Sequence, residues 1–192
     1  MEKLQMSKAE LRSEILKQRA ELAAEQQAPM DQKILERLMA EKLEQNETGT
    51  VYLYAGVRGE TRTERILDWL LREQVRVAYP RVRGKEMDFY YIASAEDLEP
   101  GCFGIPEPKS SCLKAMDTTA PVIVPGVAFS EQFERTGYGA GYYDRFFAKE
   151  PLHQKIAICY EFQMRESLAS EPHDIPMDQI VTEERSLKRR EN

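Results

Sequence analysis

The stretch Arg135-Thr-Gly-Tyr-Gly-Ala-Gly-Tyr-Tyr-Asp144 carries glycine at every second position, between an apolar run at 122–124 and a helix-compatible run at 142–149. Glycines spaced in this way let backbone N–H groups converge, and they let a ligand approach the main chain without meeting a Cβ atom. A helix that begins directly after such a loop adds free N–H groups and the positive end of its dipole. The stretch therefore predicts a strand, a phosphate-binding loop and a helix in succession.

Asp144 decides between two interpretations of this loop. A carboxylate beside a phosphate is repulsive unless a cation lies between them, and Mg²⁺ commonly bridges carboxylates to substrate phosphates. In the other interpretation, Asp144 offsets the helix dipole and the glycines form a tight turn, and the pattern alone leaves both open. The loop has neither the Gly-Lys-Ser/Thr of a Walker A motif nor the glycine spacing of the dinucleotide fingerprint. As an exposed residue of the first helical turn, Asp144 is expected to stabilise the fold by about 1 kcal/mol or less.

Composition limits the classes of protein to consider. The 192 residues suit one domain, residues 1–192, and 42% hydrophobic with 31% charged residues is ordinary for a soluble protein. A net charge of −6 argues against a general nucleic-acid surface. The cysteines, which lack CxxC spacing, indicate neither a disulfide framework nor a zinc site. With no apolar run long enough for a membrane span and no leader, we expect a cytoplasmic location.

The hydrophobic pattern alternates between strands and helices. Helices are expected over 7–26, after a break at Pro29 through about residue 45, around 66–71, over 142–149 and over 163–169. Strands are expected over 51–55, 75–79 with a stop at Pro80, 87–92, 121–124, 155–160 and 179–182, whereas 183–192 is charged and expected to fray. This order predicts an α/β domain of three layers, with a mainly parallel, twisted sheet and helices on both faces (Rossmann-like).

Further candidate site residues lie outside the glycine loop. Lys8 and Arg12 are four residues apart and share one face of the first helix, although a solvated charged face is the common explanation of such a pair. Glu60 lies in the loop after the strand at 51–55, where open α/β sheets bind ligands, and it can accept hydrogen bonds from amino groups. A charge at a helix N-terminus explains Glu60 equally well. His153 and His173 have neither zinc-site spacing nor a nucleophile motif, which disfavours triad hydrolases.

Taken together, these motifs resemble those of the 5-formyltetrahydrofolate cyclo-ligase (5,10-methenyltetrahydrofolate synthetase) family. The resemblance centres on the glycine stretch, and its specificity increases because the other fragments occur in the family's order. These fragments are Lys8-x-x-Leu-Arg12, Glu60-Thr61, Tyr79-Pro-Arg81, Phe103-Gly-Ile-Pro-Glu-Pro108, Val124-Pro-Gly-Val-Ala-Phe129 and His173-Asp174 through Asp178.

The resemblance implies a ligase that forms a C–N bond. It would convert 5-formyltetrahydrofolate to 5,10-methenyltetrahydrofolate with ATP as co-substrate and Mg²⁺ as cofactor, releasing ADP and phosphate. In the mechanism proposed for the family, the formyl oxygen attacks the γ-phosphorus, N10 closes on the activated carbon and phosphate leaves. Nucleic-acid and membrane partners are not expected, and a monomer is.

The resemblance also assigns roles by position. Catalysis falls to Arg135 and Tyr142, and the metal to Asp144 and Asp178. ATP binding falls to Lys8, Arg12, Arg135, Thr136, Gly137, Tyr138, Gly139, Ala140, Gly141, Tyr142 and Tyr143. Folate binding falls to Arg12, Ala55, Glu60, Tyr138, Gly139, Ala140, Gly141 and Tyr142. Two alternatives remain: a phosphate-binding isomerase of α/β type that uses the same loop without ATP hydrolysis, and a folate- or nucleotide-binding protein without turnover.

Overall fold

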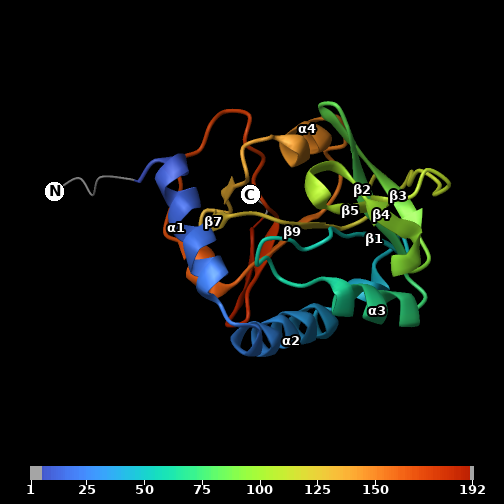
Figure 1. Ribbon diagram of the computed structural model, residues 1–192, viewed down its shortest axis with the longest axis horizontal. Coiled ribbons are helices and arrows are strands. Elements are labelled where there is room, and N and C mark those ends of the chain that lie inside the picture. Colours follow the sequence, from blue (N-terminus) through green and yellow to red (C-terminus); the bar gives the residue numbers. More distant parts are fainter. Residues whose placement is uncertain (1–5, 191–192) are drawn as a thin grey trace.

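The computed structural model describes residues 6–190, and a seven-stranded sheet runs through the middle of them (Figure 1). The order of its strands is β12-β11-β9-β6-β1-β2-β3, in which β11, β9, β6, β1 and β2 are parallel and the two edge strands are antiparallel. The strands are β1 (Thr50–Tyr52), β2 (Arg76–Arg83), β3 (Glu86–Ile92), β6 (Val122–Val124), β9 (Lys155–Ile158), β11 (Gln179–Val181) and β12 (Ser186–Lys188). The predicted fold class, a mainly parallel sheet between helices, is confirmed.

Helices cover both faces of this sheet. In Figure 1, α2 (Ala24–Ala40) and α3 (Glu64–Arg72) lie below it, α4 (Tyr142–Lys149) lies above it, and α1 (Lys8–Glu21) stands beside it. Smaller elements complete the described chain. They are the sheet of β7 (Ala128–Ser130), β8 (Arg135–Thr136) and β10 (Met164–Arg165), the pair β4 (Leu98–Pro100) and β5 (Pro106–Pro108), and the 3-10 turns Leu43–Gln45, Ala95–Asp97, Cys102–Gly104 and Glu161–Gln163.

Side chains alternate across the sheet and form two separate cores. Along β1, Val51 packs into the cluster between the sheet and the helices α2 and α3, whereas Tyr52 packs into the cluster between the sheet and α4. Neighbouring strands follow the same period of two, because successive Cβ atoms in a strand point to opposite faces. Sequence runs that are apolar throughout are therefore explained by burial on both sides of a parallel sheet.

The chain leaves the middle of the sheet in two directions. From β1 it passes through α3 to β2, and from β6 it passes through α4 to β9, on the opposite face and toward the opposite edge. The strand order therefore reverses between the neighbours β1 and β6, and sheets of this kind bind ligands in the crevice at the carboxyl ends of such strands. No helix within residues 6–190 is sufficiently long and apolar to cross a membrane.

The predicted start of α1 is confirmed, but its predicted end and the break at Pro29 are wrong. Ser7 and Glu10 form the expected capping box, whereas the chain breaks at Leu22 and Ala23, and Pro29 lies inside α2. Proline in the second turn removes one intrahelical bond. On either side of it, Gln27 and Asp31 are buried and both hydrogen-bond to the hydroxyl of Tyr160, just after β9, which holds this turn helical.

The stop predicted at Pro80 is also wrong, because β2 continues to Arg83. Ala78 turns its backbone toward β1, as its carbonyl accepts from Leu53 N–H. The backbone of Pro80, two residues later, also faces the side of β1. The hydrogen-bonded pairing of β2 with β1 has already ended at Ala78, so β1 offers no partner at Pro80. Its missing N–H therefore costs no ladder bond, and β2 can pair with β3 through Pro80.

Two further predictions, near the C-terminus, need correction. The helix expected over 163–169 is a 3-10 turn followed by β10, which pairs in parallel with β7. The segment expected to fray contains β12, which is antiparallel to β11 and places Leu187 against the apolar cluster under α4. In both cases pairing with a neighbouring strand overrides a local sequence preference.

The core under α3 gives a test of this packing. Leu70 is fully buried in α3, whereas Leu113 is 76% exposed. We expect Leu70→Ala to lower the free energy of unfolding by about 3 kcal/mol, since it removes buried methyl groups and leaves a cavity. Leu113→Ala is the matched control and should change it by less than about 0.5 kcal/mol. Urea denaturation of both variants measures the difference, and equal stabilities would contradict the assigned core.

Candidate active site

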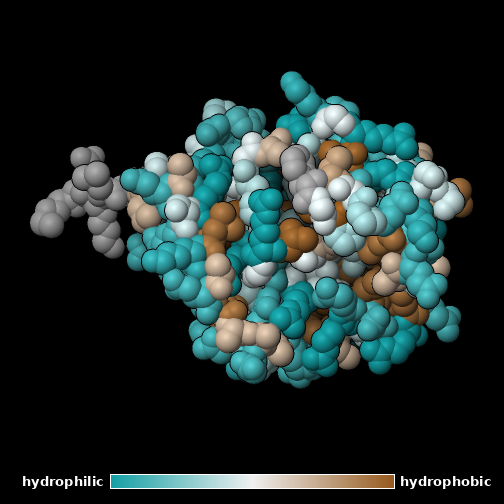
Figure 2. All heavy atoms as spheres, viewed as in Figure 1, coloured by the Kyte–Doolittle hydropathy of each residue, from teal (hydrophilic) through white to brown (hydrophobic). Residues whose placement is uncertain are grey.

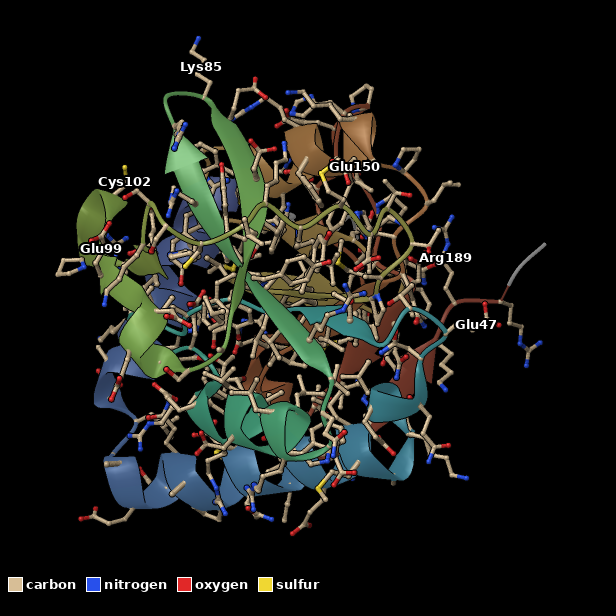
Figure 3. All side chains as sticks on the ribbon, turned by 90° about the vertical axis from the view of Figure 1, so that its right-hand side faces the viewer. Glu47, Lys85, Glu99, Cys102, Glu150 and Arg189 are labelled. Carbon is tan, nitrogen blue, oxygen red and sulfur yellow. The ribbon has the colours of Figure 1, made fainter. Side chains whose placement is uncertain are left out.

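A cavity of about 470 Å³ opens at the carboxyl ends of β1 and β6. Its walls come from the N-terminal half of α1, the loop after β1, the end of β2, the segment at 102–107, the glycine loop and the segment at 171–174. Figure 2 shows apolar surface exposed between the hydrophilic surfaces of α1, at left, and of the β2–β3 side, at right. Lys85, at the tip of the β2–β3 hairpin, projects away from the body, and Cys102 lies on the side of β4 and β5 (Figure 3).

The glycine loop runs along one wall of this cavity and leads directly into α4. Gly139 and Gly141 have φ values of +98° and +66°, which non-glycine residues rarely adopt. Gly141 caps α4, so the unpaired N–H groups of that helix begin where the loop ends. Arg12 of α1 donates from Nε to the carbonyl of Gly137 at 2.7 Å, which ties the loop to α1.

Arg135 and Asp144 form an ion pair inside the loop. Arg135 Nη2 lies 2.7 Å from Asp144 Oδ2, and their side chains are 6% and 16% exposed. Asp144 Oδ1 also accepts from the backbone N–H of Ile175 at 3.3 Å. The expectation that Asp144 is exposed is therefore wrong, and the small effect on stability that was expected from this exposure no longer has that reason. Removing this carboxylate would leave a buried guanidinium without its counter-charge.

Lys8 lines the cavity from α1 and pairs with the segment at 171–174. Its Nζ lies 2.7 Å from Asp174 and 3.1 Å from Glu171. Burial alone would lower the pKa of Lys8, but the hydrogen bonds that Lys8 donates to the two carboxylates raise it above its usual value. Burial likewise acts to raise the pKa of Asp174, and the Lys8 ammonium outweighs it and lowers that pKa. Lys8 is thus held as a cation within the lining of the cavity.

Glu60 occupies the inner wall and is 5% exposed. Its Oε2 accepts from Val57 N–H at 3.0 Å, and its Oε1 accepts from the Tyr138 hydroxyl at 2.8 Å. Burial raises the pKa of the Glu60 carboxyl, against these hydrogen bonds and the charge of Arg19. The carbonyl of Glu60 accepts from Gln27, which also donates to Tyr160. Glu60 is therefore fixed through its side chain and its backbone.

Arg19 is a buried residue that contacts the cavity wall and that the sequence pattern did not identify. It is 3% exposed, donates from Nη1 to the Tyr138 hydroxyl at 2.7 Å, and donates from Nη2 to the Gly126 carbonyl. On α1 it continues the buried stripe of Leu11 and Ile15. An arginine at a position where the helical period requires an apolar side chain is the signal that could have identified it, since buried charges require partners.

The structure brings most of the candidate residues together, but not all. Asp178 lies at the amino end of β9, where its Oδ2 accepts from the backbone N–H and the Nζ of Lys155, at 2.8 and 3.0 Å. It does not line the cavity that Asp144 lines, and no cluster of three or more potential metal ligands occurs within residues 6–190. The candidates that line the cavity are Lys8, Arg12, Ala55, Glu60, Arg135, Thr136, Gly137, Tyr138, Gly139, Ala140, Gly141, Tyr142, Tyr143 and Asp144.

Comparison with known proteins places this cavity in a family context. The model of the 5-formyltetrahydrofolate cyclo-ligase family matches residues 4–183. A 5-formyltetrahydrofolate cyclo-ligase of Mycoplasma pneumoniae is 29% identical over 93% of this chain and 100% of its own length. A probable 5-formyltetrahydrofolate cyclo-ligase of Schizosaccharomyces pombe is 30% identical over 72% of this chain and 76% of its own. The solution structure of Aquifex aeolicus 5,10-methenyltetrahydrofolate synthetase superposes with a TM-score of 0.84 at 32% identity, covering 97% of this chain and 95% of that one.

The ion pair in the glycine loop yields a stability prediction. We expect Asp144→Ala to lower the free energy of unfolding by about 2 kcal/mol, because it leaves the buried Arg135 guanidinium unpaired. The control is Asp88→Ala, which breaks the exposed pair of Asp88 with Lys114 at 2.7 Å and should cost less than about 1 kcal/mol. Chemical denaturation compares the two. A loss in Asp144→Ala no larger than in the control would show that Asp144 does not hold Arg135.

Proposed function

The chain belongs to the 5-formyltetrahydrofolate cyclo-ligase family, and on this premise we propose that it cyclises 5-formyltetrahydrofolate to 5,10-methenyltetrahydrofolate with ATP and Mg²⁺, releasing ADP and phosphate. The activity of a folate cyclo-ligase follows from the family and its relatives. The requirement for ATP and Mg²⁺ and the residue roles are the proposed part. The observation that carries them is one cavity with a glycine loop and helix N-terminus on one wall and a buried carboxylate on another.

The glycine loop would hold the triphosphate. Its support is chemical: α4 begins at Tyr142, so N–H groups without intrahelical partners adjoin Gly139 and Gly141, and anions bind readily at such an end. Lys8 and Arg12 add positive charge from α1. Arg135 is the group best suited to neutralise charge that spreads over the transferred phosphoryl group, because its guanidinium offers several donors in a fixed plane. Thr136, Ala140 and Tyr143 complete this wall of the cavity.

Mg²⁺ would bind at Asp144 together with the phosphates. The ion is commonly held by one or two carboxylates plus substrate phosphates, with water filling the remaining positions. Asp144 fits this requirement because its carboxylate lines the cavity where the glycine loop meets α4. Bound there, the ion would neutralise phosphate charge. Asp178 does not line the cavity, and our proposal does not use it.

Glu60 would bind the pterin ring of the folate. The ring carries an amino group and an adjacent ring N–H, and a carboxylate accepts such a pair of donors. Glu60 is suited to this task because Val57 N–H holds one of its oxygens in place. Ala55 lines the floor beside it. Tyr142, whose hydroxyl donates to the Gly84 carbonyl at 3.2 Å, would close the cavity between the two substrates.

The reaction would then follow from placement. The formyl oxygen attacks the γ-phosphorus and the bond to ADP breaks, so the oxygen becomes part of a good leaving group. N10 attacks the formyl carbon and loses its proton, and the carbon–oxygen bond breaks with release of phosphate. An amide oxygen is a weak nucleophile, so the contribution of the protein is orientation and charge neutralisation by Arg135 and the loop.

An activity assay tests the whole proposal. Purified protein with 5-formyltetrahydrofolate and MgATP should form the methenyl product and ADP in equal amounts, and EDTA should stop both. Product formation without ATP, or the absence of product under every condition, would refute the ATP-dependent reaction, and the second result would favour a binding protein. One domain spanning residues 1–192, a monomeric state and a cytoplasmic location stay predictions, to be checked by limited proteolysis, light scattering and cell fractionation.

The role of Glu60 predicts a pH dependence. Its pKa is raised above the ordinary value of 4.5, so the carboxylate that accepts from the pterin is lost as the pH falls through that raised value. We expect kcat/KM for 5-formyltetrahydrofolate to fall on the acid side with an apparent pKa above 4.5. Glu60→Gln should lower kcat/KM roughly tenfold or more at neutral pH and remove this acid limb. An unchanged limb in the variant would assign it to another group.

A further inference from the structure

The hydroxyl of Tyr138 bridges two buried charges. It lies 2.7 Å from Arg19 Nη1 and 2.8 Å from Glu60 Oε1. An arginine has only donors and a carboxylate has only acceptors, so the hydrogen-bond directions are fixed. The Tyr138 oxygen accepts from Arg19, and its proton is donated to Glu60. The bridge therefore presents one acceptor and one donor, in that order, to a fixed pair of charges.

The charged side chains of Arg19 and Glu60 are held in place by burial, whereas the Tyr138 side chain that joins them is free to move away. Arg19 and Glu60 are 3% and 5% exposed, and Tyr138 is 37% exposed in the cavity wall. Gly59, next to Glu60, packs so closely on α1 that a Cβ there would lie 3.0 Å from Arg19 Cβ. This contact sets the distance between the two charged residues. Tyr138, in contrast, lies between Gly137 and Gly139, where the backbone has the most freedom to turn a side chain.

Pterin rings present the same order of groups as this hydroxyl. The edge of the reduced folate ring carries a carbonyl oxygen, then a ring N–H, then an amino group: an acceptor followed by two donors. A carbonyl toward Arg19 and the N–H groups toward Glu60 would reproduce the pairing that Tyr138 now supplies. Both charges would then stay paired, which buried charges require.

We propose that the Tyr138 hydroxyl is an internal placeholder for the pterin edge, which 5-formyltetrahydrofolate displaces so that Arg19 binds the ring carbonyl and Glu60 binds the N–H groups. This inference rests on the proposed role of Glu60 and extends it. It makes Arg19 a substrate-binding residue, although Arg19 lies behind Tyr138 and not on the cavity wall. It makes Tyr138 a specificity-determining residue.

The placeholder would select among ligands by their chemistry. A ring without the acceptor–donor edge cannot replace the hydroxyl, since its entry would leave a buried guanidinium and a buried carboxylate unpaired. A site that loses a hydrogen bond in this way discriminates far more strongly than one that loses only apolar contact. The free protein keeps both charges satisfied, and only a matching ligand can exchange with the tyrosine.

Calorimetric titration of wild type and four variants tests this. Tyr138→Phe keeps the ring and removes the hydroxyl, so 5-formyltetrahydrofolate no longer has to displace it and should bind about fivefold more tightly. Tyr138→Phe keeps every backbone N–H group of the glycine loop, to which the triphosphate is assigned, so a non-hydrolysable MgATP analogue should bind within about twofold of wild type. Tyr91→Phe is the matched control, because Tyr91 also donates to a carboxylate, Asp117, outside the cavity, and it should bind both ligands as wild type does. In a Glu60→Gln background, Tyr138→Phe should give no gain.

The possible outcomes separate the two proposals. If wild type binds no 5-formyltetrahydrofolate, or Glu60→Gln binds it normally, the proposed role of Glu60 fails and the placeholder fails with it. If Glu60→Gln weakens binding but Tyr138→Phe binds the folate equally or more weakly than wild type, the placeholder alone is refuted. Loss of affinity for both ligands in Tyr138→Phe would mean that the hydroxyl supports the loop and not the selection of substrate. Arg19→Lys adds a direct test of the guanidinium: folate affinity should fall at least about fivefold with the ATP analogue unaffected.

Discussion

A charged group that lies out of water needs a partner, and the cavity of this protein is arranged around that requirement. Lys8 is paired with Asp174 and Glu171, Arg135 with Asp144, and Arg19 with Glu60 through the Tyr138 hydroxyl. The pairs of Lys8 and Arg19 join α1 to the segment at 171–174, to the glycine loop and to the loop after β1, whereas the pair of Arg135 and Asp144 lies within the glycine loop. When a charged or polar substrate binds here, it replaces the protein groups that pair with these charged side chains. The binding free energy is therefore the difference between the pairing within the free protein and the pairing with the substrate.

The fold was largely predictable because its signals are local. A capping box at Ser7 and Glu10, the apolar runs of β1, β6 and β9, and the glycine-to-helix transition at Gly141 depend on few neighbours. The wrong predictions of element boundaries concern residues whose conformation depends on contacts with segments that are distant in the sequence. Pro29 stays helical because its neighbours bind Tyr160, Pro80 stays in β2 because β1 has ended, and residues 186–188 form a strand because β11 offers an edge. Such contacts cannot be predicted from a short stretch of sequence.

The site was predictable where the motifs of the family match this sequence, because the matching positions identify site residues. The glycine loop, Lys8, Arg12, Ala55 and Glu60 do meet in one cavity. Asp178 does not join Asp144, since Lys155 holds it at the other end of the parallel strands. Arg19 went unnoticed because its importance depends on what α1 packs against, namely Gly126 and Tyr138. Neither the partner of Asp144 nor that of Lys8 can be deduced from spacing along the chain.

The central claim is that substrates take over the partners of these buried charges. A crystal structure with a non-hydrolysable ATP analogue, Mg²⁺ and 5-formyltetrahydrofolate tests it most directly. Our account predicts phosphate oxygens on the backbone N–H groups of the glycine loop, Arg135 turned from Asp144 toward the phosphates, and the pterin edge between Arg19 and Glu60 with the Tyr138 hydroxyl displaced. Nucleotide and folate bound with all three internal pairs intact, or bound outside this cavity, would contradict it.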